Sequence, residues 1–246
     1  MGGGEDPPTR EKGTTVAGPS WQWDENIQRG TDYASREVVR AYDAHMGSVR
    51  DIPGEIERIL AQLEPSPDDR VLEMGAGTGS FSRAAARRCR QVISADISEA
   101  MLAYGAERAR EEGIDNIVFR LAGFLTYEHE GDPLAAVVSQ LALHHLPDAW
   151  KFVALRRLSQ FMRPQGKLFL SDVVYHDEMD SDPFGYLRKL IDSWPEEVRA
   201  AMVRHVGHEY STFDWTMREI LARAGFVVQR MEPENRVMTH YLCTKA

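Results

Sequence analysis

Three glycines at alternate positions, Gly75, Gly77 and Gly79, follow a short apolar run and precede a helical pattern. Glycine allows the left-handed backbone conformations of a tight turn, and without side chains a ligand can lie directly on the main chain. The helix that follows would direct free N–H groups and its positive dipole end toward this ligand. The spacing predicts a turn that binds a nucleoside or nucleotide, with the backbone of Ala76 and Thr78 taking part.

Two carboxylates lie next to this turn in the sequence. Glu73 stands two residues before the first glycine, inside the apolar run 70–74, and Asp96 ends the next apolar run, 92–96. A carboxylate at the end of that second strand can accept hydrogen bonds from both hydroxyls of a ribose. A dinucleotide fingerprint would require Gly or Ala at position 80, where the chain has Ser80, so the spacing disfavours NAD.

A second group of reactive side chains follows the apolar run 134–139. His144 and His145 are candidate general bases because imidazole titrates near neutral pH. The alternative is that one of them has only a packing role and the other lies at the edge of the binding pocket. Adjacent side chains usually diverge, and no Cys or carboxylate cluster in the sequence completes a metal site, so we expect no metal. Tyr210 and His176 are further candidate bases from later loops.

These stretches together resemble the class I S-adenosylmethionine (SAM)-dependent methyltransferases that act on small molecules. The resemblance rests on E-x-G-x-G-x-G from Glu73, the acid Asp96, the segment 140–148, the Arg-Pro-x-Gly turn at 163–166 and Leu-x-x-Ala-Gly-Phe at 221–226. It covers most of residues 38–246. It implies a Rossmann-like three-layer α/β/α sandwich with a seven-stranded, mostly parallel sheet in the order 3-2-1-4-5-7-6.

The resemblance also implies the cofactor, SAM, and positions that would contact it. Ile97 and Met101 would flank the adenine, and Gln140 and Leu141 would lie near the sulfonium. Tyr42 belongs to a Tyr-Asp pair of the kind that caps the cofactor in such enzymes, although packing in a helix–helix seam explains it equally well.

One departure from the family concerns adenine recognition. Many relatives carry an acid after the third strand, which accepts a hydrogen bond from the adenine amine, but here the sequence is Ala122-Gly123-Phe124. Either a backbone carbonyl near Gly123 takes that role, or adenine is held mainly by stacking on Phe124.

The elements that must position these residues are visible as alternating patterns. Apolar runs predict strands, amphipathic spacing predicts helices between them, and the chain ends in a predicted hairpin. The strands are expected at 70–74, 92–96, 117–121, 134–139, 167–172, 226–231 and 237–244. The helices are expected at 35–46, 54–63, 81–89, 98–113, 149–162, 183–193, 195–205 and 213–224, the last capped by Thr212.

The expected organisation is a disordered tail over 1–20 and one methyltransferase domain over 21–246. Within the domain, residues 21–64 form a helical cap in which Trp21 and Trp23 fold back onto the body, by packing or as a flap. The aromatic-rich segment 173–215 reads as an insertion over the strand ends. It is interpreted as a substrate lid, with a homodimer surface as the alternative.

Composition limits the partners. The 246 residues carry a net charge of -9, which argues against a broad nucleic-acid surface. No apolar run is long enough to span a bilayer, and no signal segment is visible. Cys89 and Cys243 are expected to be buried free thiols, as in a cytoplasmic protein.

The sequence therefore predicts in-line methyl transfer from SAM to a small molecule. Two alternatives stay open: a SAM-using enzyme of another chemistry, such as cyclisation of the methionine part, and a non-catalytic SAM-binding module.

Overall fold

A computed structural model describes residues 19–27, 36–176, 182–234 and 237–246. Within these residues an eight-stranded sheet runs in the order β3-β2-β1-β4-β5-β8-β7, with the short β6 paired to β5. Among the strands of the described residues, β8 alone runs opposite to all the others, so the expected order and the reversed strand are confirmed. The strands are β1 (Arg70–Met74), β2 (Gln91–Asp96), β3 (Ile117–Leu121), β4 (Leu134–Gln140), β5 (Met162–Tyr175), β6 (Thr212–Phe213), β7 (Phe226–Pro233) and β8 (Met238–Lys245).

The central strands are continuous apolar runs because helices cover both faces of the sheet. Met74 at the end of β1 is in register with Ala95 of β2 and Ser139 of β4. The carboxyl ends of these three parallel strands therefore meet at one edge, where ligands bind in open α/β sheets.

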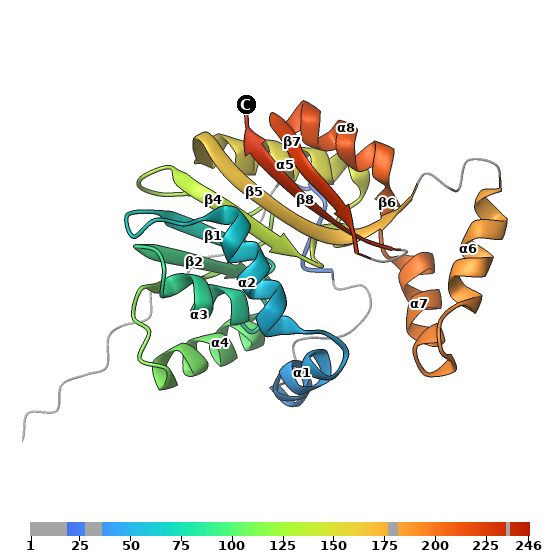
Figure 1. Cartoon of the computed structure of the whole chain (residues 1–246), viewed down its shortest axis with the longest axis horizontal. Helices are drawn as coiled ribbons and strands as arrows, with labels where there is room; N and C mark the ends of the chain where they lie inside the picture. The colour runs from blue at the N-terminus through green and yellow to red at the C-terminus, as the bar shows by residue number, and fades with distance from the viewer. Residues whose placement is uncertain (1–18, 28–35, 177–181, 235–236) are drawn as a thin grey trace, which may run out of the picture.

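Two apolar clusters fix the layers on either side of the sheet (Figure 1). On one face, α2 (Ile52–Leu63) and α3 (Ser80–Ala86) pack Leu60 and Phe81 against Val71 of β1. On the other face, α5 (Asp148–Phe161) and α8 (Asp214–Ala224) contribute Leu155 and Leu221. The helix α4 (Glu99–Glu111) packs against β2 and β3.

Three further helices lie outside this sandwich. The helix α1 (Arg36–Val49) contacts α4, whereas α6 (Pro183–Asp192) and α7 (Glu196–His208) pair with each other and project beyond the sheet (Figure 1). A small cluster that includes Tyr175 and Leu190 joins this helical pair to the end of β5. The short 3-10 turn η1 (Leu143–His145) follows β4. No helix in the described part of the chain is long and apolar enough to cross a membrane.

Most boundaries agree with the sequence, and two differ for a physical reason. Thr212 does not cap the last helix, because it belongs to β6 and pairs there with Val174 of β5. Its hydroxyl donates to Asp148, and α8 begins at Asp214. The expected turn at 163–166 lies inside β5, where Gln165 has a positive φ of 60° and the pairing with β4 shifts register. Of the expected tail over 1–20, only residues 19 and 20 fall within the described part.

Candidate active site

The glycine turn leaves β1 in a left-handed conformation. Gly75, Gly77 and Gly79 have φ angles of 71°, 54° and 72°. The backbone N–H groups of Gly75 and Ala76 both donate to Ala95 O, at 2.9 and 3.0 Å, which ties the turn to β2. A Cβ on Gly75 would lie 2.4 Å from Cβ of Ala142, so only glycine fits here.

Asp96 closes the turn from the side of β2. Its carboxylate accepts hydrogen bonds from the backbone N–H of Gly77 at 2.7 Å and of Ser98 at 2.8 Å. Burial raises its pKa, although these hydrogen bonds oppose that effect. The carboxylate is thereby held in a fixed orientation at the strand end.

Glu73 has a structural role beneath the turn. It is almost fully buried and accepts hydrogen bonds from the backbone N–H of Ser82 at 3.0 Å and from its hydroxyl at 2.5 Å. Burial raises the pKa of Glu73 to about 8. The residue anchors the first turn of α3 and does not line the cavity described next.

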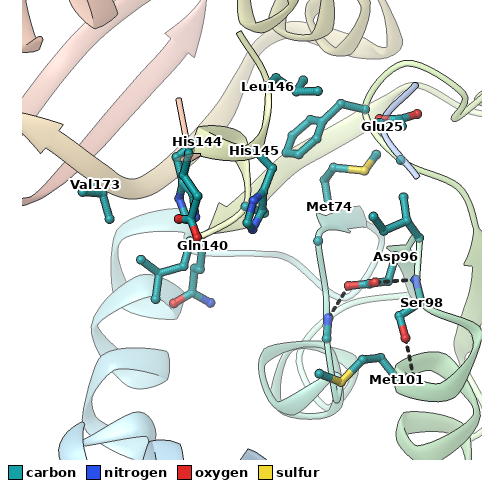
Figure 2. Close-up of a pocket in the computed structure, with 18 of the residues that line it drawn as sticks. Glu25, Met74, Asp96, Ser98, Met101, Gln140, His144, His145, Leu146 and Val173 are labelled. Atoms are coloured by element: carbon teal, nitrogen blue, oxygen red, sulfur yellow. Dashed lines mark hydrogen bonds and ion pairs between the residues drawn. The ribbon is translucent and has the colours of Figure 1, made fainter. Parts of the chain in front are cut away.

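A cavity of about 330 Å³ opens at the carboxyl ends of β1, β2 and β4 (Figure 2). Asp96, Ser98 and Met101 lie on one side of it and His144 and His145 on the other. The structure brings twelve of the residues expected from the sequence to its wall: Tyr42, Gly75, Gly77, Asp96, Ile97, Met101, Gly123, Phe124, Gln140, Leu141, His144 and His145.

The other expected residues lie elsewhere. Thr78 turns away and donates to Asp43 of α1 at 2.6 Å, which fastens α1 to the glycine turn. Ala76 and Gly79 belong to the turn without lining the cavity. Tyr210 is also outside the wall: its ring packs edge-on against Trp23, with centroids 5.4 Å apart.

The exit from β4 is strained. Leu141 has a positive φ of 52°, which is rare for a side chain branched at Cγ, and its N–H donates to Ser171 O at 2.8 Å. Such strain occurs where the surrounding structure holds a functional segment in place. Here it directs the chain from Gln140 toward the two histidines.

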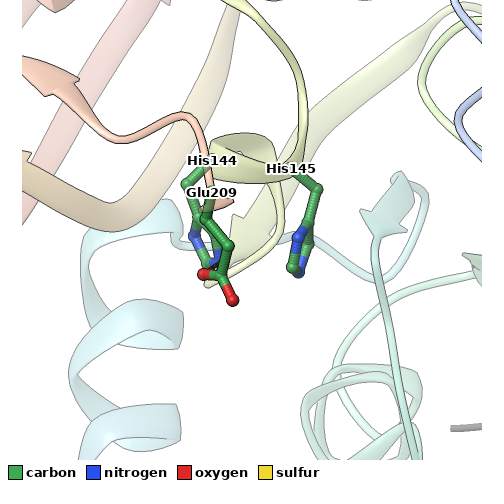
Figure 3. Close-up of side chains that lie close together, drawn as sticks. All are labelled: His144, His145 and Glu209. Carbon is green, nitrogen blue, oxygen red and sulfur yellow. Dashed lines mark ion pairs between the residues drawn. The ribbon is translucent and has the colours of Figure 1, made fainter. Parts of the chain in front are cut away.

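The histidines belong to a charged cluster in which His144 and Asp172 are buried, Glu209 is half-buried and His145 is exposed. Nδ1 of His144 lies 2.5 Å from Oδ1 of Asp172, and its Nε2 lies 3.3 Å from Oε2 of Glu209. His205 makes a close contact with the same Glu209 oxygen. The rings of His144 and His145 have centroids 4.3 Å apart (Figure 3).

This arrangement separates the pKa values of the two histidines. Burial alone would lower the pKa of His144, but the charges of Asp172 and Glu209 and their hydrogen bonds outweigh burial and raise it to about 9. Burial and the neighbouring His144 lower the pKa of His145 to about 4. For both carboxylates burial would raise the pKa, yet their histidine partners hold it below its usual range.

The structure contradicts the two premises from which no metal was expected. The two histidine rings do not diverge, and a carboxylate does complete the group, because Glu209 reaches it from the segment after α7. Single ligand atoms of His144, His145 and Glu209 all lie within 4.8 Å of one another. The signal that could have found Glu209 is its spacing of four residues from His205 at the end of an expected helix.

A second carboxylate was also missed. Glu25, from the N-terminal segment, is buried in the cavity wall, and its oxygens accept from the backbone N–H of Leu125 at 3.0 and 3.1 Å and from the Thr126 hydroxyl at 2.8 Å. It lies so close to Gly123 that a Cβ there would be 2.3 Å from its carboxylate. An acid does therefore stand next to 122–124, although it comes from elsewhere in the chain.

The N-terminal segment packs onto the body through its two tryptophans. Trp21 stacks on Trp150, with centroids 6.4 Å apart, and Trp23 meets Tyr210. Trp21 remains 74% exposed. The expected fold-back is therefore seen over residues 21–27, and the remainder of the expected flap, 28–33, lies outside the described residues.

The chain is similar to known methyltransferases. A family described as "Methyltransferase domain" matches residues 71–166. An uncharacterized methyltransferase of Geobacillus kaustophilus is 30% identical over 160 residues, which cover 64% of this chain and 66% of that protein. Among solved structures, YcgJ of Bacillus subtilis has a TM-score of 0.60 at 16% identity, covering 77% of this chain and 97% of YcgJ. The DhpI–SAH complex has a TM-score of 0.60 at 19% identity, covering 86% of this chain and 93% of DhpI.

Proposed function

The chain belongs to the class I SAM-dependent methyltransferases, and from this premise we propose that it methylates a small molecule held beside the His144–Glu209 cluster. The observation that carries the proposal is the layout of one cavity. Gly75, Gly77 and Asp96 line one side of it, and His144 lines the other side with Gln140 near it (Figure 2). A cofactor bound along the turn would direct its methyl group toward the cluster.

Each end of the cofactor has candidate partners. We propose that SAM lies along the backbone of residues 75–79, with its ribose hydroxyls on Asp96 and its adenine between Ile97 and Phe124. Support comes from their shared place on the cavity wall and from the half-buried, hydrogen-bonded carboxylate of Asp96. Met101 and Gly123 complete the adenine wall, while Tyr42 covers the methionine part.

Catalysis is proposed to depend on alignment. The acceptor atom attacks the methyl carbon, the carbon–sulfur bond breaks, and its electron pair returns to sulfur, leaving neutral S-adenosylhomocysteine. The leaving group is already good, so the protein's main task is to hold the three atoms in line and exclude water. The place of Gln140 and Leu141 on the cavity wall supports this, because the resemblance to the family puts them near the sulfonium.

A general base is secondary in this mechanism. Both histidines line the cavity, but the carboxylates of Asp172 and Glu209 raise the pKa of His144, whereas the pKa of His145 is lowered. With its pKa near 4, His145 accepts a proton only weakly at neutral pH. Tyr210 and His176 lie outside the cavity wall and are the weaker candidates.

The substrate is proposed to be small and to enter beneath the segment 173–215. Val173, His205 and Glu209 of this segment line the cavity, which supports the lid interpretation. Phe184 on α6 is 87% exposed, so self-association through the same segment stays an alternative.

The packing of Trp21 and Trp23 supports the cap proposed for residues 21–64. Both cysteines are buried free thiols, which supports a reducing, cytoplasmic setting.

Product analysis tests the proposal. The full chain is incubated with SAM and a panel of small acceptors, and the nucleoside product is identified by mass spectrometry. S-adenosylhomocysteine together with a methylated acceptor supports methyl transfer. Methylthioadenosine would indicate that the methionine part is cyclised instead, and binding of SAM with neither product would indicate a binding module.

Calorimetry with SAM, S-adenosylhomocysteine and NAD checks the cofactor, and binding of NAD alone would overturn the assignment.

A further inference from the structure

The cluster of His144, His145 and Glu209 has the composition of a metal site. Two imidazoles and one carboxylate come from η1 and from the segment that follows α7, and their side chains converge (Figure 3). We propose that these three residues bind one Zn²⁺-like divalent transition-metal ion, whose open coordination position faces the cavity.

The distances support ligation. Two ligand atoms that are each about 2.0–2.2 Å from a tetrahedral ion lie roughly 3.3–3.6 Å apart. His144 Nε2 and Glu209 Oε2 are 3.3 Å apart, which is longer than the roughly 2.7–2.9 Å of a charge-assisted hydrogen bond. All three ligand atoms lie within 4.8 Å of one another, so an inward shift of the order of 1 Å by His145 closes the site.

The outer partners are those of a metal-binding histidine. Oδ1 of the fully buried Asp172 lies 2.5 Å from His144 Nδ1, and its Oδ2 accepts from the His144 backbone N–H at 3.1 Å. A carboxylate on one ring nitrogen orients the ring and makes the other nitrogen a better ligand. His205 contacts the same oxygen of Glu209, Oε2, and its own Nε2 lies 2.7 Å from the Ser211 hydroxyl.

The ligand types indicate the class of ion. Imidazole and carboxylate without thiolate suit Zn²⁺ and its first-row neighbours, and three protein ligands leave one position for a substrate. The ion would bind an oxygen, nitrogen or sulfur atom of the acceptor and lower its pKa, so that the proton leaves to solvent before methyl transfer. This assignment of the ion's role, but not the site itself, rests on the proposed function.

Metal binding is measured on untagged, chelator-treated full chain without SAM or acceptor. We expect one equivalent of Zn²⁺ by calorimetry and, with Co²⁺, the visible absorption of a tetrahedral site. Glu209→Gln and His145→Ala should each weaken binding by about 100-fold or more. His208→Ala, an exposed histidine on the same helix as His205, should leave binding unchanged.

Asp172→Asn tests the positioning role separately, with an expected loss of about 10- to 100-fold and a changed Co²⁺ spectrum. The metal site is refuted if wild type binds no Zn²⁺ or Co²⁺, or if Glu209→Gln binds the ion as tightly as wild type. In that case a protonated His144 forms an ion pair with Glu209, and no metal ion lies between them. Affinity for S-adenosylhomocysteine, measured on the same metal-free protein, shows that each variant is folded. The same measurement separates the two proposals. If the protein binds S-adenosylhomocysteine but no metal ion, only the metal site is refuted. If it binds the metal ion but not S-adenosylhomocysteine, only the proposed methyltransferase function is refuted.

Discussion

The Glu25 carboxylate lies against the backbone N–H of Leu125, 100 residues further along the chain, at 3.0 and 3.1 Å. This contact fastens the N-terminal segment to the loop that follows β3. The same loop contributes Gly123 and Phe124 to the proposed adenine wall. The acid missing from that loop in the sequence is therefore replaced in space by one from the N-terminal segment.

Removing this carboxylate should weaken both stability and cofactor binding. Glu25→Ala leaves the buried Leu125 N–H without an acceptor, which costs about 1–3 kcal/mol, and frees the loop that holds adenine. We expect a lower Tm and weaker S-adenosylhomocysteine binding, measured by thermal unfolding and calorimetry. Glu107→Ala, at an exposed position on α4, is the control and should change neither. Wild-type affinity in Glu25→Ala would separate Glu25 from the cofactor site.

Gly123→Ala should act through the same contact. Its Cβ would lie 2.3 Å from the Glu25 carboxylate, so the acid or the loop must move. We expect the double variant with Glu25→Ala to lose less affinity than the sum of the two single losses, because the clash disappears with the carboxylate. Simple additivity in a double-mutant cycle would show that the two residues act independently.

Asp96→Asn should reduce cofactor affinity while preserving the turn. The single amide oxygen can still accept from Gly77 N–H, although Ser98 N–H loses its acceptor, and the charge that would bind the ribose hydroxyls is lost. Hydrogen bonds to charged groups contribute about 1.5–3 kcal/mol, so affinity should fall roughly 10- to 150-fold by calorimetry. Asp115→Asn, at an exposed position after α4, is the matched control. Equal affinities in the two variants would exclude the ribose role.

Local patterns were enough to predict every described strand except β6, and to predict the side of the cavity lined by the glycine turn and Asp96. The glycine turn and Asp96 are separated by one helix, so the residues on this side of the cavity come from consecutive elements of the chain. Glu25 and Glu209 could not be assigned in the same way, because each reaches the cavity from a connecting segment with no periodicity. Their positions depend on tertiary packing, in one case through Leu125 and in the other through His205.

The glycine turn offers a comparison that separates backbone strain from steric clash. Gly75→Ala combines a φ of 71° with a contact of 2.4 Å to Ala142, whereas Gly77→Ala has a φ of 54° and nothing within 4 Å. Both should lose about 1 kcal/mol or more from the left-handed backbone, and Gly75→Ala should lose about 1–3 kcal/mol more from the clash. Gly207→Ala in α7, with open space around it, should gain up to about 1 kcal/mol. Denaturant unfolding gives the three values, and equal losses at 75 and 77 would contradict the close packing of the turn.

Glu73 makes the stability of the protein depend on pH in a defined direction. Its pKa rises from 4.5 in the unfolded chain to about 8 in the fold, because burial disfavours the carboxylate. The folded state therefore binds this proton more tightly, and the associated stability is complete below pH 4.5 and is lost as pH rises toward 8. Glu73→Gln keeps an acceptor for Ser82 and cannot ionise, so its Tm relative to wild type should increase steadily between pH 5 and 8. Glu64→Gln, an exposed residue at the end of α2, should show no such trend. A constant difference in Tm between Glu73→Gln and wild type across this range would mean that Glu73 is ionised in the fold at neutral pH.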